Sequence, residues 1–94
     1  MITIIEKRVY KDAEKLPKNV LEQAAQQIEA IKASTVFSDI PNVRQMKGTE
    51  EPFYRLKFGD YRFMLYYDQN TETVKVLSLK HRKDAYKKQN LPWR

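Results

Sequence analysis

Two cations are predicted to face each other across a hairpin in the stretch FYRLKFGDYRFMLYY, residues 53–67. If Gly59 and Asp60 form a two-residue turn, Lys57 lies directly opposite Arg62. Like charges at facing strand positions destabilise a sheet unless something offsets them. A phosphate, an acidic segment of a partner chain, or screening by water would each do so. The chemistry that this pair could support is therefore the binding of an anion.

The same register divides the side chains of the hairpin between two faces of the sheet. One face is apolar and is predicted to pack on helices; it carries Tyr54, Leu56, Phe58, Tyr61, Phe63 and Leu65. The other face has three cations and no acid; it carries Phe53, Arg55, Lys57, Arg62, Met64 and Tyr66. Nucleic-acid bases stack on aromatic side chains, so this mixture favours a nucleic acid as the anion. The alternative is an ordinary solvated face of a half-exposed sheet.

The remaining elements must position this hairpin. Apolar residues at helical spacing, from Val20 to Ile31, predict a helix over about residues 17–32 that begins at Pro17. The other predicted elements are a strand at 1–7, a short helix or turn at 8–16, a loop at 33–52, strands at 53–58, 61–67 and 73–79, and a short terminal helix or turn at 84–89. This order, βααβββ(α), predicts an α+β domain whose four-stranded, largely antiparallel sheet has two helices packed on one face.

Composition excludes several classes of protein. The chain has no cysteine, so disulfides and thiolate metal sites are excluded, and its single histidine has no cluster of carboxylates beside it. We therefore expect no metal and no cofactor. The first apolar run, residues 2–5, is too short for a signal peptide or a membrane span. We expect one cytoplasmic domain over residues 1–94, with a C-terminal tail from about residue 90.

The net charge of +6 is concentrated near the C-terminus. Residues 80–94 carry a net charge of +5, whereas residues 1–79 carry only +1. A basic cluster of this kind favours an anionic partner, with nucleic acid first, and a solubilising tail is the alternative.

Together, these motifs resemble the RelE/ParE superfamily of bacterial and archaeal toxins. The resemblance rests on FYRLKFGDYRFMLYY followed by VKVLSLKHRKDAYKK, on the preceding VRQMKG, and on the helical VLEQAAQQIEAI. It spans nearly the whole chain, and it implies a RelE-like fold of the order βααβββ with a variable C-terminal element.

The resemblance implies one of two activities. RelE-like toxins are metal-independent endonucleases that cleave mRNA in the ribosomal A site, whereas ParE-like toxins poison DNA gyrase and lack the basic catalytic residues. Both are neutralised by a cognate antitoxin that wraps the toxin, here expected to present an acidic segment, and the pair contacts DNA as a repressor. We predict the RelE-like activity, with mRNA and the ribosome as partners. The alternatives are a gyrase inhibitor and a degenerate toxin that only binds its antitoxin.

Carried over residue by residue, the resemblance implies a set of catalytic residues: Arg55, Lys57, Arg62, His81, Arg82 and Tyr86. Arg55 stands where RelE itself often has lysine, and the spacing from Arg82 to Tyr86 is shorter here. Further lysines are expected to contact RNA phosphates, namely Lys47, Lys80 and Lys83.

Cleavage by the ribose 2′-hydroxyl needs a base, a stabiliser of the phosphorane charge and an acid for the 5′ oxygen. Neighbouring cations make a lysine easier to deprotonate, so Lys57 is the candidate base or charge stabiliser. His81 is the candidate proton donor or phosphate ligand, because an ordinary histidine titrates near neutral pH. Tyr86 would stack on a base or move a proton, or else pack the last helix on the sheet.

Overall fold

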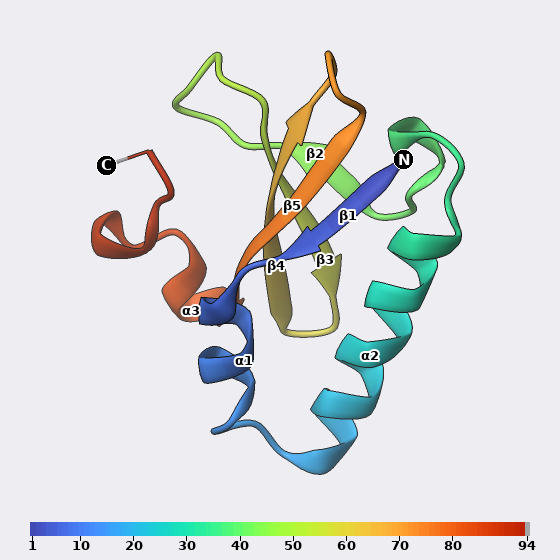
Figure 1. Ribbon diagram of the computed structural model, residues 1–94. Coiled ribbons are helices and arrows are strands. Elements are labelled where there is room, and N and C mark those ends of the chain that lie inside the picture. Colours follow the sequence, from blue (N-terminus) through green and yellow to red (C-terminus); the bar gives the residue numbers. More distant parts are fainter. Residues whose placement is uncertain (94) are drawn as a thin grey trace.

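The computed structural model describes residues 1–93, which form one sheet with helices against it (Figure 1). The strands are β1 (Ile2–Ile5), β2 (Val43–Gln45), β3 (Phe53–Phe58), β4 (Tyr61–Asp68) and β5 (Thr73–His81). They are arranged in the order β1-β5-β4-β3-β2. β1 runs parallel to β5, and the other neighbours are antiparallel. The predicted α+β class and largely antiparallel sheet are confirmed.

β3 and β4 form the hairpin that the sequence predicted, in the predicted register. Gly59 has a φ of +56°, a left-handed conformation that glycine adopts without strain. The pairs run from Phe53 opposite Tyr66 to Phe58 opposite Tyr61, so Lys57 faces Arg62. On its other side β4 pairs antiparallel with β5.

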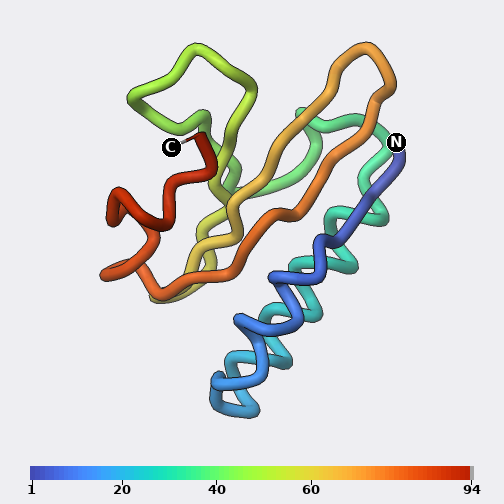
Figure 2. Tube along the Cα trace, turned by 60° about the vertical axis from the view of Figure 1, so that its left-hand side comes forward, coloured from blue at the N-terminus to red at the C-terminus, as the bar shows by residue number. Residues whose placement is uncertain are grey.

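Two helices join β1 to the rest of the sheet as a hairpin of their own (Figures 1 and 2). α1 spans Lys7–Ala13 and α2 spans Lys18–Ala33. Pro17 precedes α2 with an extended ψ of 153°, and its carbonyl accepts the first hydrogen bonds of that helix. Proline suits the start of a helix because its missing N–H would have had no partner there.

The main core lies between these helices and one face of the sheet. The buried side chains of α2 are Val20, Ala24 and Ile31, which occupy one stripe of the helix. They pack against the predicted apolar face of the hairpin and against β5, with Leu56, Leu65, Val74 and Val76 fully buried. α1 adds Val9 to the same cluster.

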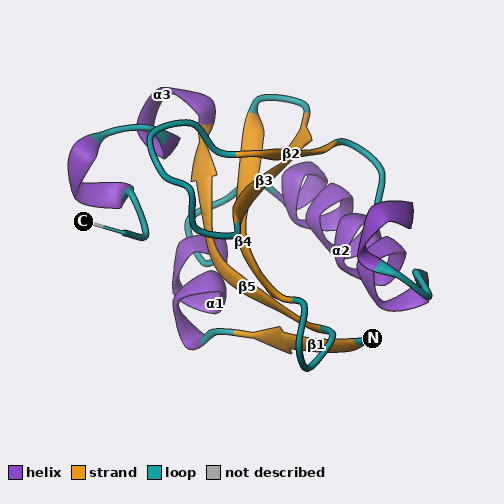
Figure 3. Cartoon of the chain, turned by 90° about the horizontal axis from the view of Figure 1, so that it is seen from above, coloured by secondary structure: helices purple, strands orange, loops and turns teal. Residues whose placement is uncertain are grey.

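The opposite face of the sheet is partly covered by the C-terminal segment (Figure 3), which starts with α3 (Arg82–Ala85). A second cluster forms there from Met46, Phe53, Met64 and Ala85. After the 3₁₀ turn Lys88–Asn90, Leu91 and Trp93 pack on this cluster. In Figure 2 the described part of the C-terminal segment lies beside the loop between β2 and β3. Arg94, the last residue of the predicted tail, lies outside the described residues.

The structure corrects three details of the sequence-based prediction. The sheet has five strands where four were predicted, because residues 43–45, expected to be loop, pair with β3. The same expected loop contains a 3₁₀ turn, Phe37–Asp39. Phe53 and Met64 are buried, with 8% and 0% of their surface exposed, so neither is available to stack on a base.

No helix in residues 1–93 is long and apolar enough to cross a membrane.

Candidate functional site

The cationic face of the hairpin is extended by β2, which brings a further arginine to it. Arg44 lies opposite Arg55, in the same row of the sheet as Met64. Lys57 lies two residues along β3 on the same face, and it is exposed. Its backbone N–H donates to the carbonyl of Asn42 (3.1 Å), which continues the β2–β3 ladder by one pair.

Two adjoining hollows open over these residues. One has a volume of about 290 Å³ and is lined by Asn42, Arg44, Arg55 and Lys57. The other has a volume of about 660 Å³ and is lined by Arg44, Gln45, Met46, Lys47, Arg55 and Tyr86. Arg44 and Arg55 are common to both, so the two hollows form one continuous surface, which we call the cationic site.

No acidic side chain lines the cationic site. Within residues 1–93 the ion pairs are Lys80–Asp12, Arg82–Asp60 and Lys87–Asp84, all outside it. The positive charges of the site are therefore left without a counter-charge in the described part of the chain. Such a surface favours an anion, and arginine binds phosphate or carboxylate through two parallel hydrogen bonds.

Tyr86 closes one side of the cationic site. The guanidinium carbon of Arg55 lies 6.0 Å from the centre of its ring, and 46% of the Tyr86 surface is exposed. α3 brings Tyr86 to this position, because Ala85 is buried on the sheet and the Arg82 N–H donates to the Asp60 carbonyl (2.7 Å). Tyr86 thus lines the same hollow as Arg55, whereas Lys57 lines the adjoining hollow.

Arg62 faces Lys57 but is turned away from solvent. Only 8% of its surface is exposed, and its Nη1 donates to the carbonyls of Gly59 (3.1 Å) and Tyr61 (2.9 Å). Its Nε is buried without a hydrogen-bond partner. Arg62 does not line either hollow of the cationic site. The facing cations are accommodated because one is exposed and the other is hydrogen-bonded to its own turn.

His81 lies apart from the cationic site, on the side of the sheet that α1 covers. Its ring packs edge-on against Tyr61, with the ring centres 5.2 Å apart. Its Nδ1 accepts a hydrogen bond from the backbone N–H of Lys83 (3.1 Å) and so caps α3. It lines a different hollow, together with Asp12 of α1.

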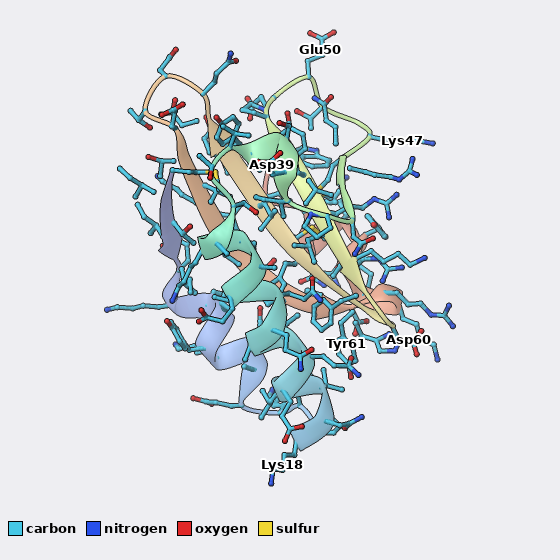
Figure 4. All side chains as sticks on the ribbon, turned by 90° about the vertical axis from the view of Figure 1, so that its right-hand side faces the viewer. Lys18, Asp39, Lys47, Glu50, Asp60 and Tyr61 are labelled. Carbon is cyan, nitrogen blue, oxygen red and sulfur yellow. The ribbon has the colours of Figure 1, made fainter. Side chains whose placement is uncertain are left out.

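The remaining predicted basic residues are scattered. Lys47 lines the cationic site and extends away from the ribbon (Figure 4). Lys80 is held by α1, since its Nζ donates to Asp12 (2.8 Å). Arg82 lies 3.6 Å from the exposed carboxylate of Asp60 at the hairpin turn, and Lys83 is exposed on α3.

Within α3, the neighbours of Asp84 perturb the pKa of its carboxyl group. The pKa of Asp84 is lowered below its usual 3.8, mainly by a hydrogen bond from Lys87 and by the charge of that lysine. His81 and Lys80 lower it further, while desolvation acts in the opposite direction.

Sequence reasoning missed Arg44 and Asn42. Both fall in the stretch that was expected to be loop, so neither was placed in register with β3. Residues 43–46, VRQM, do not alternate apolar and polar side chains, and three residues are too few to distinguish a strand from a loop by periodicity.

The order of elements, the sheet topology and the cationic hairpin define a toxin of the RelE/ParE superfamily. The chain belongs to the family described as the ParE toxin of type II toxin–antitoxin systems, parDE, which it matches over residues 4–86. No protein with a curated description matches the sequence.

Solved structures show the same fold. A chain of the RelB–RelE antitoxin–toxin complex from Methanococcus jannaschii is 22% identical, with a TM-score of 0.73 over 88% of this chain and 94% of that one. A chain of the archaeal RelE–RelB complex from Pyrococcus horikoshii is 27% identical, with a TM-score of 0.68 over 86% and 93%. One from the intact Escherichia coli RelBE complex is 21% identical, with a TM-score of 0.63 over 85% and 94%.

Proposed function

We propose that this toxin is a ribosome-dependent mRNA endonuclease and that the cationic site binds the scissile phosphate. The observation that carries the proposal is the acid-free group of Arg44, Arg55 and Lys57 beside the exposed Tyr86. This arrangement suits a polyanion with stackable bases. The resemblance to RelE-like toxins supports mRNA on the ribosome as that polyanion.

The reaction divides into charge stabilisation and proton transfer. The 2′-oxygen attacks the adjacent phosphorus, the bond from phosphorus to the 5′ oxygen breaks, and the products are a 2′,3′-cyclic phosphate and a 5′-hydroxyl. Arg55 would stabilise the charge of the phosphorane, since an arginine keeps its proton at any physiological pH. Lys57 and Tyr86 each line a hollow together with Arg55 and can exchange a proton, so one of them would take the 2′ proton and the other would give a proton to the departing 5′ oxygen.

Arg62 and His81 have less direct parts in this proposal. Arg62 is a buried positive charge opposite Lys57, and its Nη1 stabilises the hairpin turn through two hydrogen bonds. His81 would act through α3, which it caps and which carries Tyr86 toward Arg55. Arg82 pairs with Asp60 and positions the same helix. Arg62 would thus position the hairpin turn, and His81 and Arg82 would position α3.

We propose a cognate antitoxin as the protein partner. The structural neighbours from M. jannaschii, P. horikoshii and E. coli are antitoxin–toxin complexes. An acidic antitoxin segment on the cationic site would supply the missing counter-charge and block the substrate at the same time.

Inhibition of DNA gyrase is the second candidate function. Two observations favour it: the matching family is that of ParE toxins, and Arg62 is buried and engaged by its own turn. The half-buried Arg55 and the exposed Lys57 argue for the nuclease, because the resemblance implies that ParE-like toxins lack these basic catalytic residues.

Primer extension on an mRNA in a purified translation system, with and without ribosomes, tests the proposal. We expect cleavage within A-site codons only when ribosomes are present. An mRNA with a single 2′-deoxynucleotide at a cleaved position should lose that cut and keep the others. Absence of cleavage, combined with loss of gyrase supercoiling activity at equal toxin concentration, would replace the nuclease with the gyrase inhibitor.

A further inference from the structure

The sequence alone predicts no role for Arg44, yet together with Arg55 it lines both hollows of the cationic site. It lies on the edge strand β2, is exposed, and faces Arg55 across the ladder. Facing residues on neighbouring strands have Cβ atoms about 4.5–5.5 Å apart, so two guanidinium groups share one small area of surface. Within residues 1–93, no ion pair offsets either of them.

The backbone holds Arg44 in this position. Asn42 adopts a left-handed conformation, with a φ of +64°, at the point where the chain enters β2. Its carbonyl accepts from the N–H of Lys57 (3.1 Å), and at the other end of the strand the N–H of Met46 donates to the carbonyl of Phe53 (2.9 Å). These two bonds bracket the strand, so the side chain of Arg44 is fixed on the face that carries Arg55 and Lys57.

We propose that Arg44 is a substrate-binding residue that holds the RNA phosphate next to the scissile one. Arg55 and Lys57 are two residues apart on β3, about 6.8 Å along the strand. The hollow that contains Lys57 and the hollow that contains Tyr86 lie side by side, because Arg44 and Arg55 line both of them. With volumes of about 290 and 660 Å³, each hollow has room for one phosphate. Arg44 and Arg55 line both hollows, so together they clamp two successive phosphates of a single strand.

This inference rests on the proposed function for the identity of the ligand as RNA. A competing explanation is that Arg44 protects the edge of the sheet, since charged residues on edge strands discourage pairing with other chains. An edge-protecting charge would leave the affinity for RNA unchanged, whereas a phosphate ligand adds to the number of ions released on binding.

The test is binding of a fluorescent, uncleavable 2′-O-methyl RNA oligonucleotide to the wild-type protein and to three variants at several KCl concentrations. Each phosphate contact contributes about 0.7 to the slope of log affinity against log salt for a single strand. Arg44→Met should therefore reduce the magnitude of the slope by about 0.7 and weaken binding at low salt. Arg44→Lys should restore the slope, because it keeps the charge, but not the full affinity, because it loses the two-pronged hydrogen bond.

Arg8→Met is the matched control, since Arg8 is exposed on α1 and lines neither hollow of the cationic site. An unchanged slope in Arg44→Met, an equal loss in Arg8→Met, or no binding by the wild-type protein would overturn the assignment. Thermal unfolding of each variant shows whether the fold is kept.

The binding test separates this inference from the proposed function, because the oligonucleotide cannot be cleaved. If the wild-type protein fails to cleave mRNA on ribosomes while Arg44→Met still lowers the salt slope, the nuclease is wrong and the phosphate clamp stands. If the wild-type protein cleaves, Arg44→Met should raise KM at least tenfold with a smaller change in kcat. Unchanged KM would count against the clamp and leave the nuclease intact.

Discussion

Lys57 and Arg62 face each other across the hairpin, but their side chains lie in different surroundings. Lys57 is exposed, so its charge is solvated and open to a ligand, whereas Arg62 is buried and donates to two carbonyls of the hairpin turn. The repulsion between them is thus reduced by geometry before any ligand binds. A catalytic effect of mutating Arg62 has to be separated from an effect on the turn.

Replacing Arg62 with alanine should lower the free energy of unfolding by about 2 kcal/mol, because hydrogen bonds from a charged group contribute about 1.5–3 kcal/mol. Urea unfolding followed by circular dichroism measures this change. Lys57→Ala is the matched control and should stay within about 0.5 kcal/mol of the wild-type protein, as an exposed substitution does. Equal stability of Arg62→Ala and the wild-type protein would show that Nη1 does not hold the turn.

At the level of elements, the C-terminal segment and the loop between β2 and β3 depend on each other. Gly48 has a φ of +92°, and a Cβ at that position would lie 3.5 Å from the Trp93 ring. The Trp93 ring in turn lies 5.6 Å from that of Phe53, centre to centre. Trp93 therefore links the C-terminal segment both to this loop and to the second core cluster.

Replacing Gly48 with alanine should destabilise the protein by about 1–2 kcal/mol, the cost of a left-handed conformation for a residue with a Cβ. The loss should appear in urea unfolding and as a change in Trp93 fluorescence, because the loop contacts that ring. Gly59→Asn is the control, since asparagine tolerates the left-handed region of a hairpin turn. A Gly48→Ala protein with wild-type stability and fluorescence would contradict the packing of Trp93 described here.

The end of α3 offers a prediction for pH. Because the pKa of Asp84 is lowered from 3.8, the pair that it forms with Lys87 contributes to stability above that value. The contribution is lost as the pH falls through the lowered pKa. Lys87→Met should bring the pKa of Asp84 back toward 3.8, measured by NMR titration of its carboxyl carbon, whereas Lys88→Met should leave it unchanged. Because the pair is exposed, 1 M salt should reduce the difference in the Asp84 pKa between Lys87→Met and the wild-type protein. An Asp84 titration in Lys87→Met identical to that of the wild-type protein would refute the pairing.

The elements that could be predicted from the sequence are those determined by a few neighbouring residues, namely the hairpin and α2. A two-residue turn sets the register of a hairpin, so the facing of Lys57 and Arg62 followed from FGDY alone. Helical spacing likewise located α2 to within a residue at each end. β2 was missed because its three residues are strand only through their pairing with β3, a contact between parts of the chain that no local pattern encodes.

The site was predicted in part for the same reason. Of the predicted site residues, Arg55, Lys57 and Tyr86 line two adjoining hollows, while His81 lies on the face covered by α1 and Arg62 is turned inward. The burial of Phe53 depends on Trp93, forty residues further along the chain, so alternation on β3 could not reveal it. Arg44 was missed together with the strand that carries it.

At the scale of the whole molecule, the position of the free positive charge differs from what composition indicated. The excess of basic residues lies in residues 80–94, but Lys80, Arg82 and Lys87 there are within 4.0 Å of carboxylates. The cationic site instead draws on β2 and β3, where facing strands concentrate a few cations and no acid. The fold therefore determines where an anion can bind more than the distribution of charge along the chain does.

The most direct test of the central claim compares Lys57→Met with Arg8→Met in single-turnover cleavage of mRNA on purified ribosomes. If the cationic site performs the reaction, Lys57→Met should cleave at least about 100-fold more slowly than the wild-type protein, the range expected for a lost proton-transfer or charge-stabilising group. Arg8→Met should cleave at the wild-type rate, and both variants should unfold at the wild-type temperature. Cleavage by a folded Lys57→Met protein at the wild-type rate would contradict the assignment of this site to catalysis.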